Sequence, residues 1–364
     1  MSDEPRGALP YQQIHALFDA GEIIAEQPLS DHQVQPASID LRLGQRAYRV
    51  RSSFLPGPHR TVRECLESQV MHEIDLREGA VLEKSCVYIV PLLESLNLSG
   101  QLSAAGNPKS STGRLDVFTR LITDYGEEFE QVTPGYSGPL YAEIAPLTFS
   151  VLVRTGSRLS QCRFRQGDAR LTDAEHAEWQ REARLVDRTL ADADIKNGVP
   201  MSVDLSGAHS DGLIGYRAKR HSGVVDMDKP GVHPHQDFWE PLYADRGQLI
   251  LDPGEFYILV SKEAIHVPVG CAAEMVAYDT LVGEFRVHYA GFFDPGFGAP
   301  EGHGAGARAV LEVRSFDVPF VLEHGQNVGR LVYEHMLELP NLVYGRDLAS
   351  NYQSQGLKLS KHFY

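Results

Sequence analysis

An internal repeat is the feature that most constrains how this chain can fold. The segment YIVPLLESL at 88–96 resembles YILVSKEAI at 257–265, and GPLYAEIAPLTFSVLVRTG at 138–156 resembles ARAVLEVRSFDVPFVLEHG at 307–325. The offset is the same in both pairs, 169 residues (257 − 88 and 312 − 143). Between them, the turn TPGYSG at 133–138 corresponds to the turn DPGFG at 294–298. The first half has an insertion before its turn and the second half has one after its turn, so the offset of 169 is restored. One offset that returns after such insertions predicts two copies of one domain.

Each copy has a sequence pattern typical of β-strands. Short β-branched or aromatic runs such as SIDLRL (38–43), SCVYIVPL (85–92) and RAVLEVRSF (308–316) are bounded by Gly, Pro and Asn. Many short strands with turn signals favour a mainly β protein, built as two β-barrels or jelly rolls in tandem. Apolar spacing also predicts a short helix over 11–23, with Gly21 as its stop, and a charged helix over 171–194, with Thr172 as its N-cap.

The predicted domains follow from these patterns. We expect a first β-domain over residues 1–165, a linker with a helix over 166–225, and a second β-domain over 226–364. A chain of 364 residues is long enough for two cores.

Composition limits the compartment and the partners. The formal net charge of −15 argues against a non-specific nucleic-acid binder. The four cysteines are far apart and form no CxxC pair, which indicates a reducing compartment rather than a disulfide framework or a structural zinc site. No run approaches the about 18 apolar residues of a membrane span, and the start MSDEPRGALP has no apolar signal region. We therefore expect a soluble, cytoplasmic protein.

Three other motifs are weaker. GFGAPEGHGAGA at 296–307 lacks the GK[ST] of a phosphate loop, so a hairpin tip is favoured. HAE at 176–178 matches half of a zinc nucleobase deaminase motif, but no P-C-x-x-C follows, and its charged helix indicates a solvated face. HPHQ at 233–236 has no third ligand nearby and is interpreted as a loop.

The segment NPKSSTGR at 107–114 and two glutamates carry the chemistry. Two hydroxyls, loop N–H groups and an Arg fork suit phosphate oxygens. Glu143 and Glu312 occupy the same place in the two repeats, each on an apolar strand after a Pro-Gly-aromatic turn. A partly desolvated carboxylate there is suited to act as a general base on water. Together these features predict hydrolytic chemistry on a nucleotide base.

Four segments together resemble the dCTP deaminase family, which belongs with the trimeric dUTPases. They are QPASIDLRLG (35–44), KSSTGRL (109–115), the PG-aromatic turns and the closing YGRDLASNYQSQG (344–356). The resemblance covers most of both halves, apart from the linker and the glycine-rich insertion. It implies a distorted β-barrel or jelly roll assembled around three-fold axes, with active sites between neighbouring barrels. It also implies conversion of dCTP and water to dUTP and ammonia without zinc, with Mg²⁺ on the triphosphate, and possible feedback by dTTP.

The resemblance also assigns residues. Lys109, Ser110, Ser111 and Arg114 match its phosphate-binding and catalytic motif, with Ser110 and Arg114 near the attacked carbon. Glu143 matches its general acid/base, and Glu312 takes the same position in the second copy. The expected nucleotide-binding residues further include those of the turns and of the tail that closes over the nucleotide: Thr133, Asp294, Tyr344, Asn351, Tyr352 and Gln355.

The sequence also departs from the family pattern. Asp279 and Thr280 stand in the second copy where Ser-Ser is expected, and the Arg is missing there. Thr133 replaces an Asp in the first turn, and Asn351 replaces a Lys in the tail.

Two arrangements of the site remain. If like copies meet, Ser110, Ser111, Arg114 and Glu143 form the site, and we favour this arrangement slightly because it keeps a complete set on one repeat. If unlike copies meet, Glu312 and the turn at Asp294 face Ser110 and Arg114. The alternatives to a dCTP deaminase are a dUTP or dCTP diphosphatase, alone or combined with the deaminase, and a non-catalytic nucleotide-binding regulator.

Overall fold

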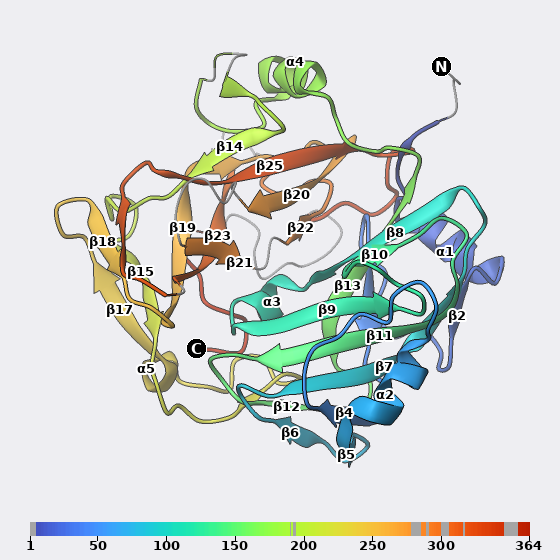
Figure 1. The fold of residues 1–364 in the computed structure, drawn as a ribbon. Coiled ribbons are helices and arrows are strands. Elements are labelled where there is room, and N and C mark those ends of the chain that lie inside the picture. Colours follow the sequence, from blue (N-terminus) through green and yellow to red (C-terminus); the bar gives the residue numbers. More distant parts are fainter. Residues whose placement is uncertain are drawn as a thin grey trace.

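The computed structural model describes residues 5–189, 191, 194–277, 285–288, 291–299, 306–315, 317–345 and 356–364. Its elements form two groups that lie side by side (Figure 1). The first group is β1 (Gly7–Ala8), α1 (Tyr11–Asp19), β2 (Ile23–Ala25), β3 (Ile39–Arg42), β4 (Arg46–Val50), α2 (Val62–Gln69), β5 (Val70–Asp75), β6 (Ala80–Leu82), β7 (Val87–Asn97), β8 (Leu102–Pro108), α3 (Ser110–Gly113), β9 (Val117–Thr123), β10 (Gln131–Val132), β11 (Ser137–Pro146), β12 (Val151–Val153) and β13 (Arg158–Gln166). The second group is α4 (Asp173–Ala183), β14 (Val199–Ser202), β15 (Leu213–Ala218), β16 (Val225–Asp226), α5 (His235–Phe238), β17 (Trp239–Tyr243), β18 (Gln248–Leu251), β19 (Phe256–Ile265), β20 (Cys271–Ala277), β21 (Phe285–His288), β22 (Phe292–Phe293), β23 (Ala307–Ser315), β24 (Phe320–Glu323) and β25 (Asn327–His335).

The sheets of the first group recur in the second. The order β5-β4-β7-β11-β9 is matched by β17-β15-β19-β23-β21, and β13-β8-β10 is matched by β25-β20-β22. β3 pairs with β13 just as β14 pairs with β25, and the pair β6–β12 has its counterpart in β18–β24. The predicted mainly β fold with two tandem barrels is confirmed.

The constant offset of the repeat reflects equivalent buried contacts. The Tyr88 hydroxyl accepts a hydrogen bond from the Glu83 N–H at 2.9 Å, and the Tyr257 hydroxyl accepts one from the Asp252 N–H at the same distance. These paired bonds fasten the turn before β7 and the turn before β19 in the same way. The tyrosines are retained because a buried hydroxyl needs a partner and each turn provides one.

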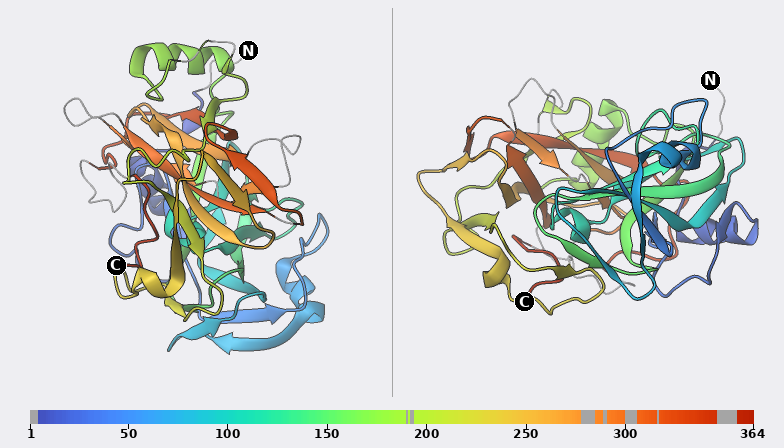
Figure 2. Two further views of the ribbon diagram at one scale, coloured as in Figure 1. Left: turned by 90° about the vertical axis from the view of Figure 1, so that its left-hand side faces the viewer. Right: turned by 60° about the horizontal axis from the view of Figure 1, so that its bottom comes forward.

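The segment predicted as a linker is part of the second barrel, which corrects the expected boundary at 226. Residues 166–225 contain α4, β14 and β15, and their apolar side chains lie in the second core (Leu171, Leu185, Val186, Val199, Met201, Val203, Leu205 and Ile214). The second copy therefore begins before α4, which precedes β14 in the chain as α1 precedes β3. The left view of Figure 2 shows α4, in green, at one end of the molecule. The Leu43 N–H donates to the Ser157 carbonyl and the Val203 N–H donates to the Gln326 carbonyl, so Leu43 and Val203 take equivalent places near the start of the two copies.

The predicted N-cap of α4 is confirmed. The Thr172 hydroxyl accepts from the Glu175 N–H, and the Glu175 carboxylate accepts from the Thr172 N–H, which is a capping box. The helix ends at Ala183 rather than near 194, because Arg184 adopts the left-handed conformation. α1 likewise ends at Asp19, two residues before Gly21, whose φ is +72°.

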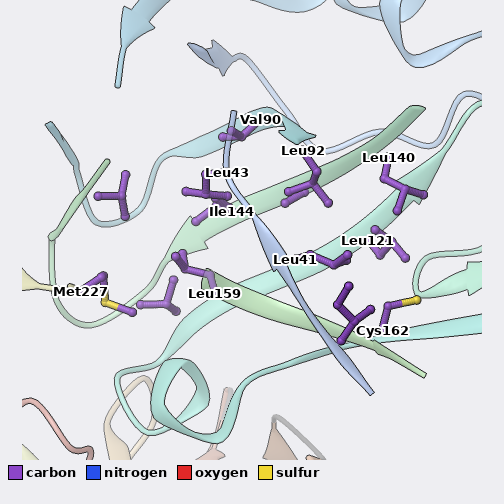
Figure 3. Packing of buried hydrophobic residues seen from close by; sticks show 14 of the residues in the cluster. Leu41, Leu43, Val90, Leu92, Leu121, Leu140, Ile144, Leu159, Cys162 and Met227 are labelled. Carbon is purple, nitrogen blue, oxygen red and sulfur yellow. The ribbon is translucent and has the colours of Figure 1, made fainter. Parts of the chain in front are cut away.

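Two main cores hold the barrels, and the first reaches into the second copy. Side chains of β3, β7, β9, β11 and β13 converge in it, and Met227 reaches it from the second copy (Figure 3). Val225, Trp239 and Phe256 also belong to this cluster. Burial of these apolar surfaces from both copies stabilises the boundary between them.

An ionic seam crosses the same boundary. Arg163 of β13 is fully buried and donates to the carbonyls of Ala273 and Phe293, at 3.0 and 3.2 Å. It also forms ion pairs of 3.3 Å with Asp294 and Glu334. A buried guanidinium needs several such partners to offset its lost hydration. The two copies are thereby placed in one definite orientation.

Candidate active site

A single helical turn presents the serines and the arginine of KSSTGR. β8 ends at Pro108, and the next turn is closed by hydrogen bonds from the Thr112 and Gly113 N–H groups to the Lys109 carbonyl, at 2.8 and 2.9 Å. Ser110 begins α3 and Arg114 caps its C-terminal end. The turn therefore brings Ser110 and Arg114 close together at the boundary with the second copy.

Arg114 faces Glu312 of the other copy. Its Nε lies 3.9 Å from Glu312 Oε1, and the two side chains are 4% and 6% exposed. Burial raises the pKa of Glu312 to about 8, and the neighbouring Arg114 guanidinium opposes the rise. A carboxyl with such a pKa can both take and return a proton near neutral pH.

Ser110 also lies against the second copy. A Cβ placed on Gly291, just before β22, would be 3.3 Å from Ser110 Oγ. The side chains of Ser110 and Arg114 therefore meet β22–β23 of the second copy, which is the unlike arrangement. In the like arrangement the first copies of neighbouring chains would meet, so our slight preference for it stays a prediction.

Glu143 has a different partner from Glu312. Arg120 of β9 lies opposite Glu143 in the sheet, and its Nε donates to Glu143 Oε1 at 3.0 Å, with a second contact from Nη2. The Arg120 guanidinium is also 3.4 Å from the centroid of the Phe129 ring. Among the described residues, no contact joins Glu143 to Arg114 or to Ser110. Its role as a catalytic group stays a prediction.

The two turns expected to bind nucleotide differ in position. Asp294 is 9% exposed and bonded to Arg163, and burial raises the pKa of its carboxyl while Arg163 opposes the rise. Thr133 is exposed, and its carbonyl accepts the Tyr136 N–H at 3.1 Å. The Asp294 turn is therefore the one built into the boundary between the copies.

Lys109 contributes a charge beside the loop. Its ammonium pairs with Asp40, whose carboxylate also lies 3.6 Å from Arg158 Nη1. Asp40 is 2% exposed, so it sets the position of Lys109. Two cations, Lys109 and Arg158, therefore lie around one buried carboxylate.

The tail is only partly described. Tyr344 packs against Phe297 with ring centroids 5.8 Å apart. Asp279, Thr280, Asn351, Tyr352 and Gln355 lie outside the described residues.

The structure adds functional candidates that the sequence motifs did not single out. Residues 356–364 return to α3: the Lys358 carbonyl accepts from Arg114 Nη1 at 3.0 Å, and Ser360 Oγ donates to the Ser111 carbonyl at 2.7 Å. Nothing in the spacing of LKLSKHFY marks these contacts, because they join residues more than two hundred positions apart.

The histidine motifs have structural partners. His176 is fully buried, contrary to the expected solvated face: Nδ1 donates to the Thr172 carbonyl at 2.9 Å, and Nε2 accepts the Tyr333 N–H at 3.0 Å. In the HPHQ loop, His233 Nε2 accepts from the Asp226 N–H at 3.0 Å. Within the described part of the chain, no three His, Cys, Asp or Glu side chains gather as a metal site would require.

None of the helices in the described part of the chain is both long and apolar enough to cross a bilayer.

Comparisons with known proteins cover both copies of the chain. Residues 5–168 match the family model of the 2′-deoxycytidine 5′-triphosphate deaminase N-terminal domain, and residues 172–363 match that of its C-terminal domain. A crystal structure of 2′-deoxycytidine 5′-triphosphate deaminase from Agrobacterium tumefaciens is 57% identical, with a TM-score of 0.87, and covers 93% of this chain and 100% of its own.

Curated relatives are also similar. A dUMP-forming dCTP deaminase of Halobacterium salinarum is 27% identical over 48% of this chain and 86% of its own length. A dCTP deaminase of Halorubrum lacusprofundi is 32% identical over 40% of this chain and 70% of its own. Matches to both domain models over nearly all of the sequence place the chain in a known family. The chain belongs to the dCTP deaminase family.

Proposed function

We propose that this chain hydrolyses dCTP to dUTP and ammonia at a site shared by its two copies. The observation that carries the proposal is the buried pair of Arg114 and Glu312, whose Nε and Oε1 atoms are 3.9 Å apart. One member comes from the phosphate-type loop of the first copy and the other from a strand of the second. Membership of the family indicates that the substrate is dCTP. In the pair, Glu312 is suited to carry a proton, and the Arg114 guanidinium beside it is a cation.

The proposed chemistry needs one group that moves a proton twice. A water oxygen bonds to C4 of the cytosine ring, the electron pair of the C4=N3 bond moves onto N3, and Glu312 takes a proton from the water and passes it to N3. The bond between C4 and the exocyclic amine then breaks as Glu312 carries the remaining hydroxyl proton to that amine, so that C4 becomes a carbonyl and the amine departs as ammonia. The raised pKa of Glu312 suits both steps, because neither protonation state is strongly favoured near neutral pH.

The loop of the first copy is proposed to hold the rest of the substrate. The Ser110 and Ser111 hydroxyls, the Lys109 ammonium and the Arg114 guanidinium suit the oxygens of a triphosphate. The ammonium and the guanidinium do not ligate Mg²⁺, so the ion is proposed to be held by the triphosphate oxygens with which it arrives. Asp294 is proposed to contact the sugar side of the nucleotide, because it lies in the same boundary.

The assay of product formation tests the proposal. Purified protein is incubated with dCTP and Mg²⁺, and nucleotides are separated by ion exchange while ammonia is measured. We expect dUTP and ammonia in equal amounts, also in the presence of a zinc-selective chelator, and no turnover by Arg114→Ala. Bound but unconverted dCTP would indicate a nucleotide-binding regulator instead.

A second activity is favoured by one specific observation. Several of the relatives, including that of Halobacterium salinarum, are named dUMP-forming. The same assay separates the possibilities, because hydrolysis of the triphosphate yields dUMP and pyrophosphate. Appearance of dUMP from dCTP, with dUTP as an intermediate, would assign the bifunctional reaction.

A further inference from the structure

The last nine described residues form a strap, defined here as residues 356–364, that joins both copies. On the side of the second copy, the Gly231 N–H donates to the Lys361 carbonyl at 2.9 Å, and His235 donates from N and Nδ1 to the Tyr364 carbonyl oxygen. The Phe363 ring lies 5.2 Å from Phe238. The C-terminus lies close to α3 and α5 (Figure 1). The strap is thus anchored at its far end.

On the side of the first copy, the strap contacts the loop that carries the arginine. Arg114 Nη1 donates to the Lys358 carbonyl at 3.0 Å. Two residues later, Ser360 Oγ donates to the Ser111 carbonyl at 2.7 Å. Ser360 is 2% exposed, so water does not replace this bond. Both bonds fasten the strap to the turn of α3 that ends in Arg114.

A buried histidine orients the serine. His362 is fully buried; its Nε2 donates to the Met227 carbonyl at 3.0 Å, and its Nδ1 lies 2.9 Å from Ser360 Oγ. Burial lowers the pKa of His362 to about 4, so the ring is neutral and Nδ1 is an acceptor. The Ser360 hydroxyl hydrogen is therefore shared between His362 and the Ser111 carbonyl, which limits its rotation.

We propose that the strap is a positioning element for the reaction, in which Ser360 and His362 hold the Lys358 carbonyl so that Arg114 stays beside Glu312. The strap contacts α3 through Arg114 and Ser111, so we assign its effect on the reaction to Arg114. This inference rests on the proposed function.

The pKa of Glu312 reports how close the Arg114 guanidinium lies. Among the described residues, Arg114 of the first copy forms an ion pair with Glu312 across the boundary. In the sheet, Glu312 lies opposite Ile258 of β19 and His288 of β21. Because the Arg114 charge lowers the pKa of Glu312, a guanidinium that moves away must raise it.

The test compares two serine variants. Ser360→Ala removes the strap bond, and Ser315→Ala removes a matched one, since Ser315 is fully buried and its Oγ donates to the Val318 carbonyl at 2.7 Å. For each variant, thermal unfolding and the pH profile of kcat/KM for dCTP are measured. If Ser360→Ala fails to fold, Ser360→Cys replaces it, because a thiol has the same shape but is a weak donor.

The expected result separates positioning from stability. Both variants lose a similar amount of stability, but only Ser360→Ala loses about tenfold in kcat/KM. In Ser360→Ala alone, the rise of kcat/KM with pH that reports loss of the Glu312 proton shifts to higher pH. Wild-type kcat/KM in Ser360→Ala, with an unshifted pH profile, would overturn the proposal. An equal loss of kcat/KM in both variants, again with unshifted pH profiles, would also overturn it. Failure of the proposed function itself would appear separately, as a wild-type protein that does not deaminate dCTP.

Discussion

Glu143 and Glu312 occupy equivalent strand positions but have different neighbours. Glu143 lies opposite Ile89 and Arg120, and Glu312 lies opposite Ile258 and His288. The Arg120 guanidinium binds Glu143 directly, whereas Arg114 approaches Glu312 only to 3.9 Å. The Glu143 carboxylate is therefore occupied by a hydrogen-bonded guanidinium, whereas burial raises the pKa of Glu312 to about 8 and keeps a proton within reach near neutral pH.

This difference predicts opposite outcomes for two matched substitutions. Glu312→Gln should lower kcat about 10²- to 10⁴-fold with little change in stability, because an amide cannot carry the proton. Glu143→Gln should keep kcat within a few-fold but destabilise the fold by about 3 kcal/mol, because Arg120 loses its buried partner. Single-turnover kinetics and urea unfolding of both variants measure this. Loss of turnover in Glu143→Gln alone would return the chemistry to the first copy.

The raised pKa of Glu312 also predicts a pH dependence. The general base is the carboxylate, so kcat/KM should fall about tenfold per pH unit below its pKa of about 8 and level off above it. A profile of kcat/KM from about pH 6 to about pH 9 measures this, with dCTP affinity followed in parallel as a control. A flat profile over that range would mean that Glu312 is not the base.

At the scale of elements, α4 shows how a motif can be misjudged without its packing. HAE lies on a helix rich in charge, yet His176 is buried against Tyr333, with centroids 5.9 Å apart, and both its ring nitrogens are bonded. Only Glu178 of the motif is exposed. The helix fastens the second barrel rather than connecting two domains.

We therefore expect His176→Ala to lower the free energy of unfolding by about 3 kcal/mol, since it leaves the Tyr333 N–H unpaired and opens a cavity. Glu178→Ala, two residues away, should change it by less than about 0.5 kcal/mol. Burial lowers the pKa of His176, so its contribution should be complete above the ordinary value of 6.5 and shrink as the pH falls below it. Urea unfolding of the wild type and both variants at several pH values measures the two changes in unfolding free energy and the pH dependence of the His176 contribution. Equal effects of the two substitutions would contradict a structural role for His176.

At the scale of the whole molecule, the boundary between the copies has two functions. Its ion pairs and shared core hold the barrels together, and its residues form the proposed site. Asp116 of the first copy pairs with Arg314 of β23, two residues beyond Glu312, with both side chains largely buried. Contacts that stabilise the boundary thereby also place Glu312 relative to Arg114.

Because both members of the site come from one chain, activity per chain should not depend on protein concentration. We expect constant specific activity on dilution over about three orders of magnitude, even if an oligomer with three-fold symmetry dissociates. Activity assays paired with light scattering measure this. A loss of specific activity that follows dissociation would show that a neighbouring chain completes the site.

The sequence by itself determined the doubling of the chain, its β class, the Thr172 cap and the loop that carries Ser110, Ser111 and Arg114, because repeats, alternation and turn chemistry are local patterns. It did not determine which glutamate faces Arg114, where the second copy begins, or that Ser360 and His362 return to α3. Only the tertiary structure decided these points. Burial, strand register and the packing of one barrel against the other join residues that are distant in sequence. The two glutamates hold equivalent positions in the repeat, and only these distant neighbours distinguish their surroundings.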